Sequence, residues 1–305
     1  MKQQFTGALS GLRQLNLLDL QTYKNALSQT NRLCWQQYFP FMYCFSQNPT
    51  RKILIGEEDG SICVYLLMKE EGRFKLFLYF LPMPMSTSAL RLAVQRVKDF
   101  NFSKNAVIFW VDAENLGIFD SIPTKKIITL DQEYIYSPAT FKSMEGSKFK
   151  NFRYNLSRIR ARDDIQIRPY NIDDADACLR VLSDWTELQS SKYENIRGHD
   201  YTQECLRLAP QFNSRDLFGL VVLVGGEIRS FGFGGEMRPG LGNIFITKSD
   251  HRIKGLNYFL RYHLVLTMDG CELVNDSTAN GAGVQYAKES CCPVSMHSMF
   301  RIHLS

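Results

Sequence analysis

The sequence predicts a mixed α+β protein with two domains in tandem, each built on a mostly antiparallel sheet flanked by helices. Three observations predict this fold. The chain has 305 residues, which is long enough for two separate hydrophobic cores. Its second half follows the element order β-α-α-β-β-β-α-β-α-β, and its first half repeats that plan more loosely. A basic segment, residues 146–162, lies between the halves, so the expected domains are 1–145 and 146–305.

The second half gives the clearer pattern. Its expected elements are, in order, a strand at 166–168, helices at 172–191 and 201–209, strands at 217–224, 227–236 and 243–247, a helix at 253–268, a strand at 272–274, a helix at 284–290 and a strand at 295–303. Gly225 and Gly226 form the two-residue turn of a hairpin. This order of elements resembles the Gcn5-related N-acetyltransferase (GNAT) fold.

The first half contains the same kinds of element. The expected elements are a helix at 18–28, strands at 41–45, 52–56, 61–68 and 75–79, a helix at 86–99, and strands at 106–111, 127–130 and 134–137. Asp59 and Gly60 are a good hairpin turn between two of these strands. Two successive units of this kind indicate a tandem arrangement of one fold.

The basic segment predicts an amphipathic helix without acidic residues. At helical spacing one stripe is apolar and consists of Phe149, Phe152, Leu156 and Ile159. The remaining surface carries the cations Lys148, Lys150, Arg153, Arg158, Arg160 and Arg162. Such a helix suits a polyanion, which would be a phosphate-rich cofactor, a tRNA end or a lipid head group. The alternative is an ordinary solvated helix face.

The composition is that of a globular protein, with 45% hydrophobic and 22% charged residues and a net charge of +5. The eight cysteines show no C-x-x-C spacing, so we expect reduced thiols and neither a disulfide framework nor a metal site. No apolar run is long enough to cross a bilayer, and the N-terminus lacks the apolar core of a signal peptide. We therefore expect a cytoplasmic protein with at most peripheral membrane contact.

One loop resembles the phosphate-binding loop of the GNAT fold. Proteins of that fold bind a pyrophosphate at the start of the helix after the fourth strand, through backbone N–H groups. Residues 252–257 occupy this place, and Arg252 and Gly255 fit the usual Arg/Gln-x-x-Gly-x-Gly/Ala pattern. Asn257 stands where a small residue lets the backbone approach the phosphate. The loop predicts coenzyme A binding by a damaged motif, and the alternative is an ordinary capped helix start.

The expected strand at 227–236 is rich in glycine. Glycine weakens a strand unless another backbone or a ligand comes close to it. A substrate lying beside the strand would explain Gly232 and Gly234 as parts of an acceptor cleft, and Glu236 would face that cleft as a candidate base. The alternative is a bend of the sheet against a large aromatic neighbour.

Polar residues follow the strand expected at 272–274. In α/β sheets the carboxyl end of an interior strand opens onto the ligand crevice. Asp276 is therefore a candidate base, and Asn275 and Tyr286 are candidates for the acceptor cleft. Lys288 is a candidate donor to a phosphate or a developing oxyanion, with an ordinary surface lysine as the alternative.

Five short motifs together resemble one family. They are Asp131-x-x-Tyr134-x-Tyr136, Gly146-x-Lys148-x-Lys150-x-x-Arg153-x-Asn155, Asn275-Asp276, Gly281-x-Gly283 and Ala287-Lys288-x-Ser290-x-x-Pro293. The set is similar to the DUF2156 group, soluble proteins related to the C-terminal domain of phosphatidylglycerol lysyltransferases. These are tandem acetyltransferase-like folds akin to the Fem peptidyltransferases. The resemblance covers most of the chain in architecture and is carried mainly by residues 131–160 and 270–293.

The resemblance implies an aminoacyltransferase, because such enzymes move an aminoacyl group from aminoacyl-tRNA to a lipid or peptide acceptor. Position by position it implies that phosphates are held by Lys148, Lys150, Arg153 and Asn155. It implies that the donor or acceptor end is lined by Asn275, Asp276 and Lys288. The chain lacks the transmembrane bundle of the lipid-modifying enzymes and their aromatic-rich, arginine-containing tail, which argues against a phosphatidylglycerol acceptor.

The expected reaction is direct attack of an amine or hydroxyl acceptor on an activated ester or thioester. A covalent enzyme intermediate is not expected, since the sequence has no G-x-S-x-G elbow. The oxyanion would be held by backbone near Ile246 or by Lys288, and the base would be Asp276, Glu236 or, as a third candidate, His251. Two donors stay open, aminoacyl-tRNA and acyl-CoA. The acceptor is a small molecule, a peptide or a lipid head group. A non-catalytic binding module of the same fold is the alternative to an enzyme.

Overall fold

The chain forms two compact units. The computed structural model describes residues 7–190, 198–279 and 281–305. The first unit comprises residues 1–132 and 297–305, and the second comprises residues 133–296. The expected division at residue 145 differs from this in two ways. The second unit begins earlier, because a strand at 133–136 pairs in its sheet, and the last residues of the chain return to the first unit.

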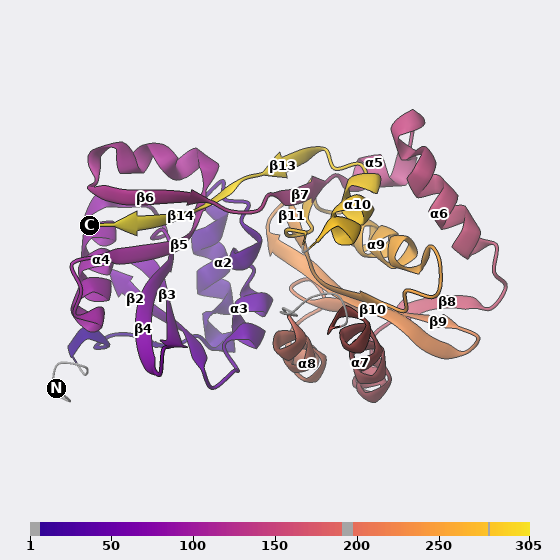
Figure 1. Cartoon of the computed structure of the whole chain (residues 1–305), viewed down its shortest axis with the longest axis horizontal. Helices are drawn as coiled ribbons and strands as arrows, with labels where there is room; N and C mark the ends of the chain where they lie inside the picture. Colours follow the sequence, from indigo (N-terminus) through magenta and orange to yellow (C-terminus); the bar gives the residue numbers. More distant parts are fainter. Residues whose placement is uncertain (1–6, 191–197, 280) are drawn as a thin grey trace. The chain divides into compact units, whose positions relative to one another are not determined.

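The first unit is built on a seven-stranded sheet with the order β1-β2-β3-β4-β5-β14-β6 (Figure 1). Its strands are β1 (Arg13–Gln14), β2 (Arg51–Glu58), β3 (Ser61–Glu70), β4 (Arg73–Phe80), β5 (Ala106–Asp112), β6 (Thr124–Thr129) and β14 (Met299–Leu304). Neighbouring strands are antiparallel except β4 and β5. The helices are α2 (Leu20–Ser28), α3 (Phe39–Phe45) and α4 (Thr87–Asn101). Helix α4 buries Leu90, Ala93 and Val97 against the sheet.

Two expectations for individual elements are wrong. Residues 41–45, expected as a strand, lie in helix α3, which has Pro40 in its first turn. A short apolar run fits a buried helix as well as a strand, and proline is favoured at a helix start. The single strand expected at 295–303 is two strands, β13 (Ser295–His297) and β14, which belong to different sheets.

From residue 165 onward, the second unit has the predicted order β8-α7-α8-β9-β10-β11-α9-β12-α10-β13, and β7, α5 and α6 precede it. Its seven-stranded sheet has the spatial order β13-β7-β12-β11-β10-β9-β8. The strands not yet located are β7 (Glu133–Tyr136), β8 (Ile165–Pro169), β9 (Phe218–Val224), β10 (Glu227–Arg238), β11 (Leu241–Ser249) and β12 (Leu273–Asn275). The helices are α5 (Pro138–Ser143), α6 (Lys150–Arg160), α7 (Ala175–Ser190), α8 (His199–Leu208), α9 (Leu256–Thr267) and α10 (Ala282–Ser290). Strands β11 and β12 are parallel, as expected after the α9 crossover.

Helices cover both faces of this second sheet. Helix α9 packs on one face of β10 and β11, and helix α7 packs on the other (Figure 1). Successive residues of β11 therefore face different helices, so that Thr247 contacts Arg261 of α9 while Lys248 lies against Trp185 of α7. The two sides of one strand thus have separate chemical surroundings.

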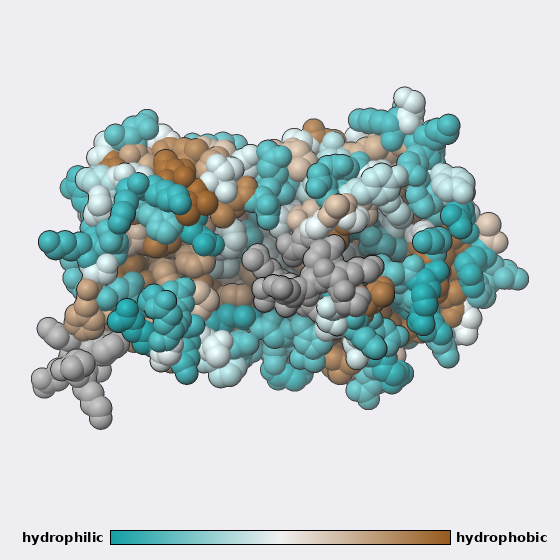
Figure 2. Space-filling model, viewed as in Figure 1, coloured by the Kyte–Doolittle hydropathy of each residue, from teal (hydrophilic) through white to brown (hydrophobic). Residues whose placement is uncertain are grey.

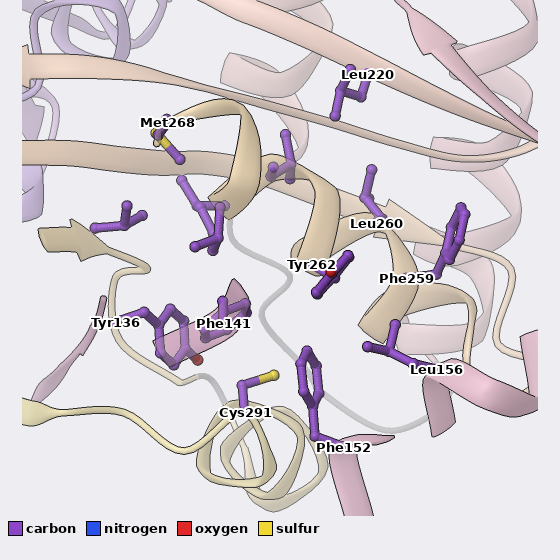
Figure 3. Close-up of a cluster of buried hydrophobic side chains, with 14 of the residues drawn as sticks. Tyr136, Phe141, Phe152, Leu156, Leu220, Phe259, Leu260, Tyr262, Met268 and Cys291 are labelled. Atoms are coloured by element: carbon purple, nitrogen blue, oxygen red, sulfur yellow. The ribbon is translucent and has the colours of Figure 1, made fainter. Parts of the chain in front are cut away.

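The apolar stripe predicted for the basic segment forms the edge of the main core. Phe149, Phe152, Leu156 and Ile159 are all buried. In Figure 3, Phe152 and Leu156 of α6 lie in one apolar cluster with Phe259, Leu260 and Tyr262 of α9. The rings of Phe152 and Tyr262 have centroids 6.3 Å apart. Helix α6 is thus anchored by its apolar side, which leaves its charged side outward.

Candidate functional site

Three charged side chains meet below the protein surface where β12 ends. Arg261 of α9 donates from Nε to Oδ2 of Asp276 at 2.6 Å. Lys288 of α10 places Nζ 3.6 Å from Oδ1 of the same carboxylate. Each of these three side chains is no more than 4% exposed. One carboxylate therefore lies between two cations, and we name Arg261, Asp276 and Lys288 the buried ion cluster.

The surrounding polar groups fix the cluster in place. Arg261 also donates from Nη1 to Oδ1 of Asn257 at 3.1 Å. Lys288 Nζ donates to the carbonyl oxygens of Asp276 and of Thr278, the latter at 2.9 Å, and lies 3.2 Å from the Ser277 hydroxyl. Ser277 has φ +53°, an unfavourable backbone conformation for a residue with a side chain. Lys288 therefore holds a strained turn directly after the strand.

The ionisation of the cluster follows from its burial. Burial opposes the charge of Arg261, but the Asp276 carboxylate more than offsets this effect and holds the pKa of Arg261 above its ordinary value. Burial lowers the pKa of Lys288 to about 8, although the Asp276 carboxylate opposes that shift. Arg261 thus stays cationic, and Lys288 loses its proton more readily than a lysine in water.

The predicted catalytic residues do not all come together. Asp276 and Lys288 are neighbours, but Glu236 lies elsewhere on the sheet. Glu236 of β10 is in register with Gly242 of β11, which is in register with Val274 of β12. It accepts a hydrogen bond from Nε of Arg215 at 2.7 Å. Two of the three candidate bases, Asp276 and Glu236, are therefore engaged by cations.

Gly232 and Gly234, predicted to line an acceptor cleft, pack against a helix instead. A Cβ on Gly232 would lie 2.8 Å from Cδ1 of Leu264 and 2.7 Å from a backbone oxygen. A Cβ on Gly234 would lie 3.5 Å from Cε of Met268. Leu264 belongs to α9 and Met268 caps it, so the missing side chains let this helix approach the sheet closely. The expectation of a cleft at these two glycines is corrected on that ground.

Asn275 takes part in a second buried polar group, on the side of the sheet opposite α9. Its Nδ2 donates to Oε2 of Glu133 at 2.6 Å, and both residues are fully buried. Asn243 is the register partner of Asn275 and is also fully buried. Neither amide atom of Asn243 forms a hydrogen bond within the described part of the chain. Sequence reasoning missed Glu133 and Asn243, although a polar residue opening the expected strand at 243–247 was a usable signal.

Tyr286 is exposed and joins two helices. Its hydroxyl accepts a hydrogen bond from Nδ2 of Asn151 at 3.1 Å, and the same nitrogen donates to Oγ of Ser290 at 3.0 Å. These contacts link the first turns of α6 to α10. Asn275 and Tyr286 were both predicted for the acceptor cleft. Asn275 is buried and Tyr286 is exposed, and their hydrogen-bond partners differ.

The loop predicted to bind a pyrophosphate is occupied by protein contacts. Arg252 donates from Nε and Nη2 to the Asp250 carboxylate at 2.8 and 2.7 Å. Gly255 has φ +88°, and a Cβ there would lie 2.5 Å from the carbonyl oxygen of Asn155 in α6. The Asn257 side chain turns toward Arg261. Helix α6 therefore covers Gly255, one of the two residues that fitted the phosphate-binding pattern.

The cations of the basic segment divide into two groups. Arg153 donates from Nη1 to the Gly146 carbonyl oxygen at 2.9 Å, and Arg162 pairs with Asp164 at 2.7 Å. Asn155 donates from Nδ2 to the Asn151 carbonyl oxygen at 2.9 Å. These three residues have local structural partners, which the prediction of phosphate contacts for Arg153 and Asn155 did not anticipate.

The other cations stay exposed and form no ion pair with any described residue; they are Lys148, Lys150, Arg158 and Arg160. Arg158 lies over the exposed ring of Tyr154, with 5.6 Å from Cζ to the ring centroid, and Arg160 lies over Tyr262 at 4.6 Å. In Figure 2 the surface over α6 is mostly hydrophilic. We name these four cations the α6 cationic face.

Three further properties bear on the chemistry. All eight cysteines are buried, and none of them forms a disulfide with another described residue. The described residues contain no group of three or more His, Cys, Asp or Glu side chains suited to a metal ion. None of the helices in the described ranges has both the length and the hydrophobicity needed to span a lipid bilayer.

Comparison with known proteins gives a family and a fold. The family model described as phosphatidylglycerol lysyltransferase, C-terminal, matches residues 52–293. A search of the curated proteins finds no match. A conserved protein of unknown function from Bacteroides thetaiotaomicron is 17% identical and has a TM-score of 0.79, covering 96% of this chain and 99% of that chain.

Two other solved structures carry names related to the predicted family. The L-PGS of Bacillus licheniformis is 13% identical with a TM-score of 0.67, covering 96% of this chain and 93% of that chain. FemX is 8% identical with a TM-score of 0.62, covering 94% and 96%. A tandem GNAT protein also shares the fold, at a TM-score of 0.51. The predicted fold of two tandem acetyltransferase-like domains and the predicted family resemblance are confirmed.

Proposed function

This chain belongs to the phosphatidylglycerol lysyltransferase C-terminal family, and we propose that it is an acyltransferase that moves an aminoacyl group from aminoacyl-tRNA to an amine or hydroxyl acceptor. The family description names a lysyl transfer, and the two-unit fold is that of L-PGS and FemX. The acceptor is a small molecule, a peptide or a lipid head group.

The observation that carries the tRNA donor is the α6 cationic face. A helix that paired its cations with neighbouring acids would offer little attraction to a polyanion. Here Lys150 and Arg158 stay exposed and unpaired within the described residues, whereas Arg162 is neutralised by Asp164. Exposed cations that bind phosphates release counterions, and this supplies most of the free energy of non-specific RNA binding. The Tyr154–Arg158 pair adds an exposed aromatic surface on which a base can stack.

The loop at residues 252–257 supports tRNA over acyl-CoA as the donor. A coenzyme A pyrophosphate would need backbone N–H groups at the start of α9. Gly255 lies against the Asn155 backbone there, and Arg252 is already bound to Asp250. The α6 cationic face, by contrast, has no ion pair with any described residue.

The proposed reaction is a direct transfer. The acceptor nitrogen or oxygen attacks the ester carbonyl carbon, the new C–N or C–O bond forms, and the ester C–O bond breaks as the ribose hydroxyl of the tRNA leaves with a proton. The buried ion cluster keeps the turn after β12 in one conformation, which positions the groups around it. Asp276 serves as the counter-ion of Arg261 and Lys288 rather than as the base.

The test is transfer of a radiolabelled aminoacyl group from a mixed pool of charged tRNAs. The variant carries Lys150→Ala and Arg158→Ala, and the matched control is Arg162→Ala, which removes a cation that is already paired. We expect the double variant to lose at least about tenfold in deacylation or transfer, since each phosphate contact contributes to affinity, while the control stays near the wild type. Equal activity of the double variant and the wild type would show that the α6 cationic face does not bind the tRNA, and a wild type that releases no label from any charged tRNA would remove tRNA as the donor.

A further inference from the structure

The first unit has a surface pocket beside the start of strands β4 and β5, where the two strands have not yet joined. Among the described residues, the parallel pairing of these strands begins at Leu78 and Ile108. Before that point the side chain of Asn101 takes the place of a neighbouring strand. It accepts a hydrogen bond from the Leu76 N–H at 2.9 Å and donates one to the Leu76 carbonyl oxygen at 2.6 Å. The pocket has a volume of about 650 Å³, which is within the range of small-molecule sites.

Exposed aromatic rings line this pocket. Phe74 of β4 is 42% exposed, and Phe102, at the C-terminal end of α4, is 60% exposed. Phe102 has φ +50°, a left-handed conformation that is unfavourable for a residue with a side chain and that glycine usually takes at helix ends. Because most of its surface remains exposed, burial gives little reason for a phenylalanine at this position. The two rings thus offer stacking surfaces to a ligand.

The charge of the pocket is positive. Its walls include Arg73, Lys75 and Arg301. Glu70 is the sole acid among the lining residues that the structure describes, and Lys75 binds it at 3.0 Å. Arg73 is exposed, and the Arg301 guanidinium lies over the Phe109 ring, with 4.3 Å from Cζ to the ring centroid. Cations therefore outnumber acids here, and the pocket attracts an anion.

A histidine at the end of β14 reports the same positive potential. His303 also lines the pocket, and its register partner on β6 is Lys126. Burial lowers the pKa of His303, and the charges of Arg301, Lys126 and Lys125 lower it further. The imidazole is therefore mostly neutral at neutral pH, and the positive charge of the pocket comes from its arginines and lysines.

We propose that this pocket binds a nucleoside phosphate. The base stacks on the rings of Phe74 and Phe102, and the phosphate is held by Arg73 and Arg301. Proteins that bind single strands combine aromatic stacking surfaces with cations in this way, and a guanidinium group binds phosphate through paired hydrogen bonds. A free nucleotide and a nucleotide of single-stranded RNA share this chemistry. Every lining residue belongs to the first unit, so the site goes beyond the proposed transfer and does not depend on the α6 cationic face.

The experiment is isothermal titration calorimetry of the whole chain with adenosine 5′-monophosphate (AMP). The main variant is Phe102→Gly, which removes the ring and leaves a residue that favours the left-handed conformation, so the fold is kept. The matched control is Leu92→Ala, which shortens another exposed apolar side chain of α4 that does not line the pocket. We expect Phe102→Gly to weaken AMP binding at least about fivefold, the lower limit for the loss of one base stack, and Leu92→Ala to leave it unchanged. Thermal denaturation of both variants verifies that they are folded.

A second pair of variants tests the phosphate contact. Arg73→Gln removes an exposed cation of the pocket, and Arg91→Gln removes an exposed cation of α4 outside it. We expect Arg73→Gln to weaken the binding of AMP about fivefold and to leave the binding of adenosine unchanged, because only AMP carries the phosphate. Arg91→Gln should change neither. Adenosine and inorganic phosphate should each bind the wild type more weakly than AMP does.

The trinucleotide pCpCpA separates the two sources of the nucleotide. If it binds more tightly than AMP and Phe102→Gly removes that gain, the ligand is single-stranded RNA; if it binds no more tightly, the ligand is a free nucleotide. A wild type that does not bind AMP would overturn the proposal. Equal affinities of Phe102→Gly and Leu92→Ala for AMP would also overturn it, since the nucleotide would then lie elsewhere. None of these measurements involves aminoacyl transfer, so a failed transfer reaction leaves them unaffected.

Discussion

Gly255 and Asn155 bring helices α9 and α6 into backbone contact, since a Cβ on the glycine would lie 2.5 Å from the asparagine carbonyl oxygen. The N-terminal end of α9 therefore packs directly against α6. In the sequence this glycine indicated a phosphate-binding loop, but in the structure it serves the crossing of two helices. The same contact fixes α6 in place and so determines where its cations lie.

This contact predicts an unusually large effect of Gly255→Ala. Gly226 is the matched control, because it also has a positive φ, +78°, but has no atom within 4 Å of a built Cβ. We expect Gly226→Ala to lower the free energy of unfolding by about 1–2 kcal/mol, the backbone cost alone. Gly255→Ala should lower the free energy of unfolding by about 3 kcal/mol or more, since α6 and α9 must also move apart. Urea denaturation measures both, and equal losses would mean that the helices adjust without cost.

The buried ion cluster predicts that Asp276→Asn destabilises the protein strongly. This substitution keeps the shape of the side chain but leaves Arg261 and Lys288 without an anion. Breaking a buried pair by removing one partner costs about 3–5 kcal/mol. Asp164→Asn, which breaks the exposed pair with Arg162, should cost less than about 1 kcal/mol. Thermal and urea denaturation compare the two variants, and a small effect of Asp276→Asn would show that the cluster is not needed for folding.

Lys248 predicts a dependence of stability on pH. Its pKa is about 7 in the folded protein, and a lysine in the unfolded chain has a pKa of about 10.4. Below about pH 7 Lys248 is protonated in both the folded and the unfolded state, so it adds no pH dependence to the free energy of unfolding. Between these values the unfolded state binds more protons, and the free energy of unfolding should rise with pH, by at most about 1.4 kcal/mol per unit.

The measurement compares wild type with Lys248→Met, a substitution of similar volume that cannot titrate. The wild type should gain stability relative to this variant as the pH rises from about 7 to about 9. Lys254→Met, at an exposed position, should follow the wild type throughout. A difference between wild type and Lys248→Met that does not change with pH would show an ordinary, solvated amine.

The α6 cationic face predicts the salt dependence of tRNA binding. Each phosphate contact contributes about 0.7–0.9 to the slope of log affinity against log salt concentration. Lys150→Ala and Arg158→Ala should therefore each reduce the slope by about 1. Arg162→Ala should leave it unchanged, because Asp164 already neutralises that arginine. Filter binding at a series of salt concentrations checks this, and a slope that none of the three variants changes would place the RNA elsewhere.

Much of the fold was predictable because local patterns determine it. The hairpin turn at Gly225 and Gly226 has the positive φ values that such turns require, and the buried stripe of α6 follows directly from helical spacing. What could not be predicted was sheet membership. A strand pattern in residues 295–303 shows which side chains alternate, but it does not show that the chain leaves one sheet after β13 and enters the other as β14.

The candidate site was predictable only in part. Asp276 and Lys288 were expected near each other, and they are. Arg261 was missed, although a single arginine inside the apolar run of α9 was a usable sign of a buried partner. Lys248 was missed because its environment comes from Trp185 of α7, the helix on the face of the sheet opposite α9. The spacing of residues along β11 does not reveal this contact. Contacts between side chains on different elements, such as these two, can be identified only from the three-dimensional structure.

Strand β14 has a consequence for how the protein is made. It lies between β5 and β6, so these two strands lack their common partner until residues 299–304 leave the ribosome. All of the second unit is synthesised in the interval. During translation the nascent N-terminal sheet therefore exposes two unpaired edges, and unpaired edges are where unfinished chains associate with one another. Of these two units, the one that begins earlier in the sequence is therefore completed later.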